Sequence, residues 1–384
     1  MTRRIEADSL PTQIMDQSQP LETERGSGIS IGIHYAQEEI TNKYIGNLGI
    51  VTRRGPLTEE RVLETIGIET RFRAAEHETV GFMAREASKD ALQGSTDVDA
   101  IIFLTTRPTG QDEIAALEQE LNLQNVDKKL SMPIYAACAG FGRALTYIKE
   151  NEKAFWGKRV VIASGEDYSR FVEKLEDQGD GKENPVLDGA VFSDQGSAIV
   201  FTYGVDFVIH SRENFPFPEE HDTITTPFDE GLLSVREPYI YEPPQGVVNS
   251  QIFSQNGSRV FKTVVRRIPS CIIYVVEKAG MTMNDIDLIN PHQPTGTTVN
   301  ALAEAMGSHE DKVIKDAEKG NSSSGSAIRA WARANSEGRI KPGTKMVVIG
   351  FGTGMFAAGA VLEIMPSQET IEMFEENLDL ALAA

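Results

Sequence analysis

Cysteine is scarce in this sequence: only Cys138 and Cys271 occur among 384 residues. Two cysteines cannot build the framework of several disulfides that stabilises small secreted domains. We therefore expect both to be free thiols in a reducing compartment, and we predict a cytoplasmic protein.

Positive charge is also scarce. The sequence has 37 lysines and arginines but 57 aspartates and glutamates, which gives a formal net charge of −20. Nucleic acids and anionic membrane surfaces both require basic patches, so we expect neither as a partner. No apolar run reaches membrane-spanning length, and the polar N-terminus has no signal-peptide core. Metal-ligand spacing is absent too, and we expect no metal and no cofactor.

From Ile29 onward the sequence alternates short apolar runs with amphipathic segments. The apolar runs are rich in β-branched residues and predict strands, whereas segments such as 79–92 and 251–280 predict helices. Strand–helix alternation of this kind is typical of an α/β architecture with buried sheets.

The two halves of the chain repeat one another. DVDAIIF at Asp97 returns as DIDLINP at Asp285, an offset of 285 − 97 = 188. KRVVIASG with Val160 returns as KMVVIGFG with Val347, an offset of 347 − 160 = 187. The spacing predicts a duplicated unit, with one half over 29–205 and the other over 206–364. A chance match of short apolar strings is the alternative.

Two tails fall outside this repeat. Residues 1–28 lack periodicity and predict a loosely held arm. Residues 365–384 predict an amphipathic helix whose apolar face holds Ile371, Phe374, Leu378 and Leu382. We expect this helix to dock on its own subunit, with docking on a partner as the alternative.

Cys138 lies in YAACAGFGRAL, between a predicted strand and a predicted helix. Its small neighbours allow a sharp backbone turn and close approach of a substrate. The positive end of the helix dipole favours a thiolate, which attacks thioesters and forms an acyl-enzyme. The alternative is an inert buried cysteine. We assign Cys271, in an apolar helical context, to the core.

Two further segments carry polar side chains at the ends of predicted elements. His292, in INPHQPTG, ends a predicted strand, where α/β folds place their sites. Asn321, in KGNSSSGSA, opens a helix that repeats the one opened by Cys138. Asn321 suits a helix N-cap, but convergence of the duplicated helix termini predicts that it also meets Cys138. The turn GFGTG, at 350–354, offers backbone N–H groups for an oxyanion hole.

Taken together, these segments resemble the thiolase superfamily, and most closely beta-ketoacyl-acyl-carrier-protein synthase III. Further similarity runs through GIETRFRA, AVFSDQGSAIV and GRIKPGTKMVVIGFGTG, so the resemblance covers residues from about 29 to 364. It implies a thiolase-like five-layered αβαβα fold built from two duplicated halves, and a homodimer.

The resemblance also implies an activity, the decarboxylative Claisen condensation of an acyl group with a malonyl thioester. Cys138 would carry the acyl group from acyl-coenzyme A, while His292 and Asn321 would stabilise the enolate of a malonyl unit on acyl carrier protein. The backbone N–H groups of Cys138 and Thr353 would form the oxyanion hole. Four further residues are predicted to line the substrate: Phe141, Gln293, Gly352 and Gly354.

The sequence departs from the family pattern at several places. Thr295 and Thr297 replace an asparagine and a carrier-docking arginine, and the residues that flank the adenine of coenzyme A are missing. Residues 111–113 replace an aromatic of the acyl pocket. We therefore expect an unusual donor or acceptor.

Three alternatives to condensation stay open. The first is an acyltransferase that moves the group to oxygen, nitrogen or sulfur without decarboxylation. The second is a non-catalytic partner of an active ketosynthase, and the third is a thiol hydrolase.

Overall fold

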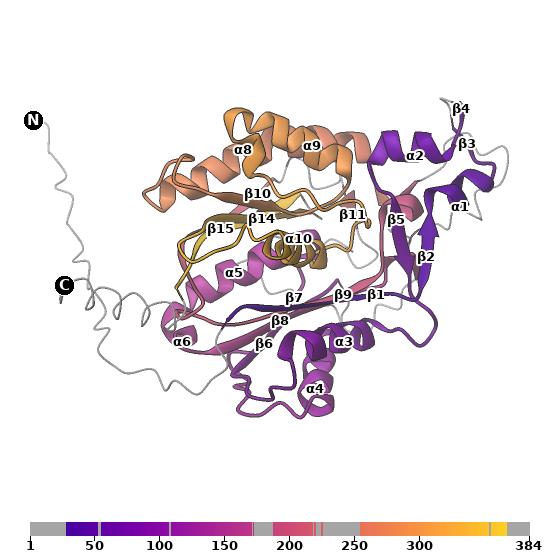
Figure 1. Cartoon of the computed structure of the whole chain (residues 1–384). Coiled ribbons are helices and arrows are strands. Elements are labelled where there is room, and N and C mark those ends of the chain that lie inside the picture. Colours follow the sequence, from indigo (N-terminus) through magenta and orange to yellow (C-terminus); the bar gives the residue numbers. More distant parts are fainter. Residues whose placement is uncertain are drawn as a thin grey trace, which may run out of the picture.

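The apolar runs of the sequence form two sheets that lie on either side of a layer of helices (Figure 1). The computed structural model describes residues 28–52, 55–106, 109–170, 172, 187–217, 219, 224–225, 254–352 and 355–366. The predicted arm and the predicted terminal helix therefore lie outside the described residues, apart from Gly28, Met365 and Pro366.

The first sheet has five strands, in the order β1-β9-β8-β6-β7. Their bounds are β1 (Ser30–Tyr35), β9 (Gln195–Thr202), β8 (Arg159–Glu166), β6 (Ala100–Leu104) and β7 (Met132–Ile134). β6 pairs in parallel with β7 and β8, and β9 pairs antiparallel with β8 and β1. Every residue of β6, β8 and β9 is buried, because helices cover both faces of the sheet.

The second sheet repeats this arrangement. Its strands are β10 (Phe207–Pro216), β15 (Phe356–Ile364), β14 (Lys345–Gly352) and β13 (Leu288–Pro291), in that order. β13 and β14 are parallel, as β6 and β8 are in the first sheet. β14 and β15 are antiparallel, as are β8 and β9. A parallel bridge between Ile289 and Val313 occupies the position that β7 has in the first sheet. A duplicated unit produces this correspondence, although the boundary at 205–206 stays a prediction.

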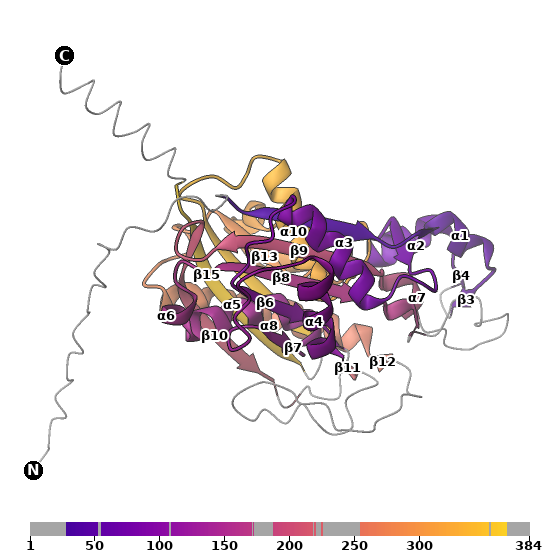
Figure 2. The same cartoon turned by 90° about the horizontal axis from the view of Figure 1, so that it is seen from below.

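Helices form the other three layers, so the αβαβα order predicted from the sequence is confirmed (Figure 1). The bounds of these helices are α3 (Val80–Leu92), α4 (Gly110–Glu120), α5 (Gly140–Glu150), α10 (Gly325–Ser336), α8 (Gly257–Lys278) and α9 (Gly296–Ala305). α5 and α10 lie between the sheets and contact both. α8 and α9 cover the outer face of the second sheet, and α3 and α4 that of the first, as the view from below shows (Figure 2).

Smaller elements extend one side of the layers (Figure 1). They are α1 (Asn42–Asn47), α2 (Glu59–Ile66), the pair β2 (Glu38–Thr41) and β5 (Thr70–Arg73), and the pair β3 (Val51–Thr52) and β4 (Gly55–Pro56). The remaining elements are η1 (Ala137–Ala139), α6 (Glu152–Phe155), η2 (Tyr168–Arg170), α7 (Asp188–Val191), η5 (Gly307–Lys312), β11 (Ile224–Thr225) and β12 (Ser254–Gln255).

Local sequence explains where several helices begin. Thr41, Thr58 and Thr79 precede α1, α2 and α3, and each hydroxyl accepts a hydrogen bond from the N–H three residues further on. Such capping satisfies one of the free N–H groups of the first turn. Among the helices of the described ranges, none combines the length and the apolar character that crossing a membrane requires.

The central helices join the two halves. Phe141 of α5 contacts Trp331 of α10 edge to face, with ring centroids 6.1 Å apart, and both side chains are buried. Aromatic pairs in this geometry add about 0.5–1.5 kcal/mol beyond the area that they bury. The N-termini of α5 and α10, where the predicted site lies, are therefore fixed relative to one another by the core.

Candidate active site

Cys138 lies in η1, one short turn ahead of α5. The residue before it, Ala137, has a left-handed backbone with φ of 42°, which L-residues with a Cβ adopt only at a cost. Gly352, at the end of β14, lies against it: a Cβ on Gly352 would come within 2.7 Å of the Cys138 Cβ and 3.2 Å of its backbone N. Absence of a side chain at Gly352 thus leaves room for the cysteine.

The pKa of the Cys138 thiol lies above the ordinary cysteine value, although the residue is only partly buried. Burial raises its pKa to about 12, and the nearby Glu166 carboxylate acts in the same direction. The nearby hydroxyl of Ser323 acts in the opposite direction. The upward shift of the pKa is opposite to the shift that the helix dipole alone favours, because loss of hydration penalises the thiolate.

His292 follows β13 directly and is buried, with 2% of its surface exposed. Its N–H donates to the carbonyl of Ile349 on β14 at 2.8 Å, and its ring lies edge to face on Phe351. Nδ1 lies 2.8 Å from Oγ of Ser326. Burial lowers the pKa of His292 to about 3, so the imidazole is neutral at physiological pH.

Asn321 lies four residues before α10, whose N-cap is Ser324, so it does not cap the helix as predicted. Its Oδ1 instead accepts the N–H of Ser323 at 2.8 Å. Its backbone bonds to the segment ahead of β9, through the carbonyl of Val191 and the N–H of Ser193, each at 2.9 Å. Since Oδ1 is occupied, the two hydrogens of Nδ2 remain for a ligand.

Ser323 connects the three predicted catalytic residues. It is fully buried and has φ of 52°, and its hydroxyl acts to lower the pKa of the Cys138 thiol. Its N–H donates to Oδ1 of Asn321 at 2.8 Å, and its carbonyl accepts from the Ser326 hydroxyl, whose Oγ lies 2.8 Å from Nδ1 of His292. The structure thus gathers Cys138, His292 and Asn321 around one strained residue. The sequence prediction missed Ser323, and the run of hydroxyls in NSSSGS was the available signal.

Two more buried groups beside Cys138 escaped the sequence prediction. Glu166 ends β8 and accepts a hydrogen bond from the Thr106 hydroxyl at 3.2 Å. Tyr168 stacks on Phe192 with centroids 4.5 Å apart, and burial raises the pKa of its phenol well above the ordinary value. The surroundings of the sulfur are therefore polar as well as buried.

The predicted substrate-lining residues occupy different settings. Gln293 is fully buried, and its amide bonds to backbone groups: Nε2 donates to the carbonyls of Pro291 and Ile314, and Oε1 accepts from Asp316 N. Phe141 is buried in the core and Gly352 lies against Cys138. Thr353 and Gly354 lie outside the described residues. Their substrate contacts stay predictions.

Comparison with known proteins gives the same result at three levels. Residues 276–364 match the family described as 3-Oxoacyl-[acyl-carrier-protein (ACP)] synthase III C terminal. Beta-ketoacyl-[acyl-carrier-protein] synthase III of Oceanobacillus iheyensis is 27% identical over 304 residues, covering 77% of this chain and 87% of the relative. The Neisseria gonorrhoeae protein of that name is 29% identical over 316 residues, covering 79% and 90%.

The chain is thus similar to the synthase III enzymes, which are thiolase-superfamily condensing enzymes, in its C-terminal family match, in sequence and in fold. Solved structures share the fold. 3-Oxoacyl-[acyl-carrier-protein] synthase III from Aquifex aeolicus superposes with a TM-score of 0.70 at 23% identity, covering 88% of this chain and all of that one. The priming beta-ketosynthase from the R1128 polyketide biosynthetic pathway gives 0.67 at 23%, covering 89% and 97%.

The residues that depart from the family pattern make local contacts in this chain. The hydroxyl of Thr295 caps α9 by accepting from Thr298 N at 3.1 Å. Thr297 donates its hydroxyl to the carbonyl of Thr65 on α2 at 3.2 Å. Gly67 and Gly296 touch there, since a Cβ on Gly296 would lie 2.4 Å from the Gly67 carbonyl oxygen. Small residues at these positions thus join α2 to α9 where the family usually has an arginine.

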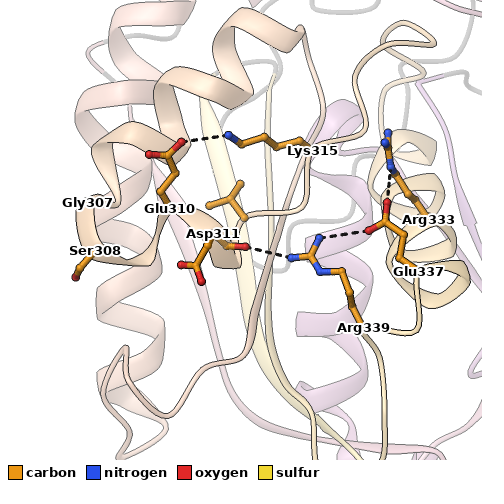
Figure 3. Close-up of a pocket in the computed structure, with 9 residues that line it drawn as sticks. Gly307, Ser308, Glu310, Asp311, Lys315, Arg333, Glu337 and Arg339 are labelled. Atoms are coloured by element: carbon orange, nitrogen blue, oxygen red, sulfur yellow. Dashed lines mark hydrogen bonds and ion pairs between the residues drawn. The ribbon is translucent and has the colours of Figure 1, made fainter.

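A separate surface pocket of about 460 Å³ lies between η5 and the end of α10 (Figure 3). Two cationic side chains that line it form ion pairs with acidic side chains of the same pocket: Lys315 with Glu310 at 3.3 Å, and Arg339 with Glu337 at 3.6 Å. Because these charges satisfy one another, we assign the pocket no part in catalysis.

Proposed function

We propose that this chain catalyses decarboxylative Claisen condensation of an acyl group on Cys138 with a malonyl-type thioester, giving a β-ketoacyl product. One observation carries the proposal: Ser323 donates its N–H to Asn321, is linked to His292 through the Ser326 hydroxyl, and acts to lower the pKa of Cys138. A nucleophile and two neutral hydrogen-bonding groups thereby lie around one residue, and the two half-reactions need such a group.

In the first half-reaction, the Cys138 sulfur attacks the carbonyl of an acyl-coenzyme A. The new carbon–sulfur bond replaces the bond to coenzyme A, which leaves as the thiol with the proton that Cys138 gives up. Because the pKa of Cys138 is raised to about 12, proton loss accompanies the attack rather than preceding it. The Ser323 hydroxyl stabilises negative charge on the sulfur as it develops.

In the second half-reaction, the bond between the malonyl carboxylate and its methylene breaks and carbon dioxide leaves. The electron pair becomes an enolate, whose carbon attacks the acyl-cysteine and expels the Cys138 sulfur, which regains a proton. His292 through Nε2 and Asn321 through Nδ2 donate to the enolate oxygen. Fixed donors aimed at developing charge are often the largest contribution to catalysis.

The tetrahedral intermediates require a second set of donors. We assign this oxyanion hole to the backbone N–H groups of Cys138 and Thr353. The close approach of Gly352 to the Cys138 backbone supports the assignment, since it brings the end of β14, directly before Thr353 in the sequence, to the cysteine.

The proposal extends to partners and organisation. Relatives carry the acyl carrier protein in their names, and we propose that the malonyl unit arrives on that carrier. We further propose a homodimer of cytoplasmic subunits, each made of duplicated halves over 29–205 and 206–364. Free Cys138 and Cys271 and the matching strand order of the two sheets support these assignments.

Intact-protein mass spectrometry tests the proposal. The protein is incubated with a panel of acyl-coenzyme A thioesters and then with malonyl-acyl carrier protein or malonyl-coenzyme A. We expect a mass gain that Cys138→Ala abolishes, followed by discharge with release of carbon dioxide. Discharge only by an alcohol, amine or thiol would indicate an acyltransferase, and discharge by water alone a hydrolase. A gain seen only with a second subunit would indicate a ketosynthase partner.

A further inference from the structure

The outer face of α8 is both basic and apolar, in a chain whose net charge is −20. Residues 257–276 of this helix hold no acidic residue but four cations: Arg259, Lys262, Arg266 and Arg267. Six large apolar side chains are exposed in the described part of the chain, and three of them belong to α8: Phe261, Ile273 and Tyr274. Exposed apolar groups gathered on one element are typical of an interaction surface.

This face points away from the sheet. α8 lies in the outer layer over the second sheet (Figure 1), and the opposite side of the helix is buried. Lys262, Arg266 and Ile273 are exposed and follow one another at spacings of four and seven residues, which places them on one stripe of the helix. Positive charge and apolar surface are therefore presented side by side.

The segment that follows the described residues is complementary to this face. Residues 367–384 contain five acidic residues and no lysine or arginine. In the amphipathic helix that their sequence predicts, Glu372, Glu375 and Asp379 recur at spacings of three and four, beside the apolar face that begins at Ile371. An acidic stripe beside an apolar one matches the cations and the exposed apolar side chains of α8.

The chain leaves the second sheet towards the C-terminal end of α8. The N–H of Met365 donates to the carbonyl of the residue directly before β10, at 2.9 Å. Further along β10, the Ser211 hydroxyl donates to the carbonyl of Val275, near the end of α8, at 2.6 Å. Just past the other end of β10, the guanidinium carbon of Arg267 lies 5.7 Å from the centroid of the Phe217 ring. α8 therefore runs antiparallel to β10 and ends towards Met365.

The segment is long enough to cover the face. Along β10, about 16 Å separates Met365 from the level of Ser211, and residues 366–370 span about the same length when extended. A helix over 371–384 is about 21 Å long, against about 24 Å for α8 from Val275 back to Arg259. The two helices would lie antiparallel, which brings opposite ends of their dipoles together.

We propose that residues 371–384 form a helix that docks antiparallel on the outer face of α8 of the same subunit. In this arrangement Glu375 and Asp379 lie over the cations Lys262 and Arg266, and the apolar side chains of the two helices cover one another. The inference goes beyond the proposed function and does not depend on it, because it holds whether or not Cys138 accepts an acyl group.

Hydrogen–deuterium exchange of the full chain tests the docking. We expect amides of residues 371–384 to exchange at least about tenfold more slowly than those of an unprotected chain. Lys262→Glu with Arg266→Glu replaces attraction by repulsion and should speed their exchange by about tenfold. Adding Glu375→Lys with Asp379→Lys to that variant restores opposite charges and should restore the protection.

A charge reversal on another outer helix is the matched control. Arg85→Glu with Lys89→Glu on α3 reverses two cations at the same spacing of four residues and changes the net charge equally. It should leave the exchange of residues 371–384 within about twofold of wild type. The comparison separates contact with α8 from a general effect of added negative charge.

A disulfide cross-link identifies the subunit on which the segment docks. In a Cys138→Ala, Cys271→Ser background, Ile273→Cys with Phe374→Cys should be cross-linked by oxidised glutathione within one chain. The product then migrates as a monomer on a non-reducing denaturing gel. Leu63→Cys replaces Ile273→Cys in the control, because Leu63 is exposed to a similar extent on α2, and it should give no cross-link.

Four outcomes would overturn the inference. Unprotected amides at 371–384 in the wild type would leave the face of α8 to another occupant, such as an acidic carrier protein. Protection that survives Lys262→Glu with Arg266→Glu, or that the control on α3 removes equally, would show that charge complementarity does not hold the segment. A cross-link between two chains would assign the docking to a second copy, and an equal cross-link to Leu63→Cys would remove its specificity.

Discussion

Arg329 of α10 binds Asp316 on the segment that leads to Asn321, with Nε 2.7 Å from the carboxylate. The same guanidinium donates to the carbonyls of Asp316 and Gly320, at 2.7 and 3.0 Å, and to Oε1 of Gln195 on β9 at 2.9 Å. Three of these four hydrogen bonds go to the loop at 316–320. We infer that the loop ahead of Asn321 is held by Arg329.

Arg329→Met should therefore destabilise the protein strongly. The substitution leaves the Asp316 carboxylate buried without its cation, which costs about 3–5 kcal/mol when one partner of a buried pair is removed. Chemical denaturation measures the free energy of unfolding. Arg333→Met is the matched control, because Arg333 lies on the same helix and reaches Asp316 at 3.4 Å but is 38% exposed. Its loss should cost below about 1 kcal/mol; equal effects of the two variants would contradict the assignment.

Gly352→Ala should slow acylation. The added methyl would lie 2.7 Å from the Cys138 Cβ, so the nucleophile must move by a fraction of an ångström or more. Displacements of about 1 Å cost about 10²-fold in rate. The rate of mass gain from acyl-coenzyme A measures this. Gly359→Ala on β15 is the control, since its nearest contacts are 3.4 Å or longer. Normal acylation in Gly352→Ala would show that the site tolerates the methyl group.

Asn321→Asp should separate folding from catalysis. Aspartate retains an oxygen to accept the N–H of Ser323 at 2.8 Å, so the turn should form and the melting temperature should change little. The donor Nδ2 is lost and a negative charge faces the enolate. We expect decarboxylation to fall by at least about 10²–10³-fold while acylation persists. A variant that still releases carbon dioxide from malonyl thioester at the wild-type rate would refute the role of Asn321.

Alkylation of Cys138 should depend steeply on pH. Only the thiolate reacts, and burial raises the pKa of this thiol to about 12, so the thiolate fraction grows about tenfold per pH unit far below that value. We expect the rate with iodoacetamide to rise without a plateau from about pH 7 to 10 in a Cys271→Ser background. The same protein in urea should level off above about pH 9, near the ordinary cysteine value. A plateau below pH 8 in the native state would mean that the helix dipole lowers the pKa of Cys138 more than burial raises it.

The positions of the three catalytic candidates could be predicted from sequence because each lies at a junction of elements. Small residues around Cys138 marked the turn between β7 and α5, and the apolar run before His292 marked β13. The repeat predicted that the start of α10 lies opposite that of α5. These signals are local, or depend on a spacing that duplication preserves.

Electrostatic and hydrogen-bonding properties could not be predicted in this way. The pKa of the Cys138 thiol depends on Glu166 and Ser323, which are distant from it in the chain. Gln293 was predicted to line the substrate, but whether its amide meets ligand or backbone depends on the loop that holds Asp316. The sequence shows which residue types are present, whereas the partners of a side chain follow from tertiary packing.

The order of strands in each sheet has a consequence for synthesis of the chain on the ribosome. β1 lies at the sheet edge and pairs with β9, so Ser30 meets Val200, 200 − 30 = 170 residues later. β10 likewise cannot pair until β15 has been synthesised, because Phe207 pairs with Ile364, 364 − 207 = 157 residues later. Pairings so distant in sequence close slowly. A nascent chain therefore exposes an unpaired strand edge for most of each half, and this is the period in which it most needs a chaperone.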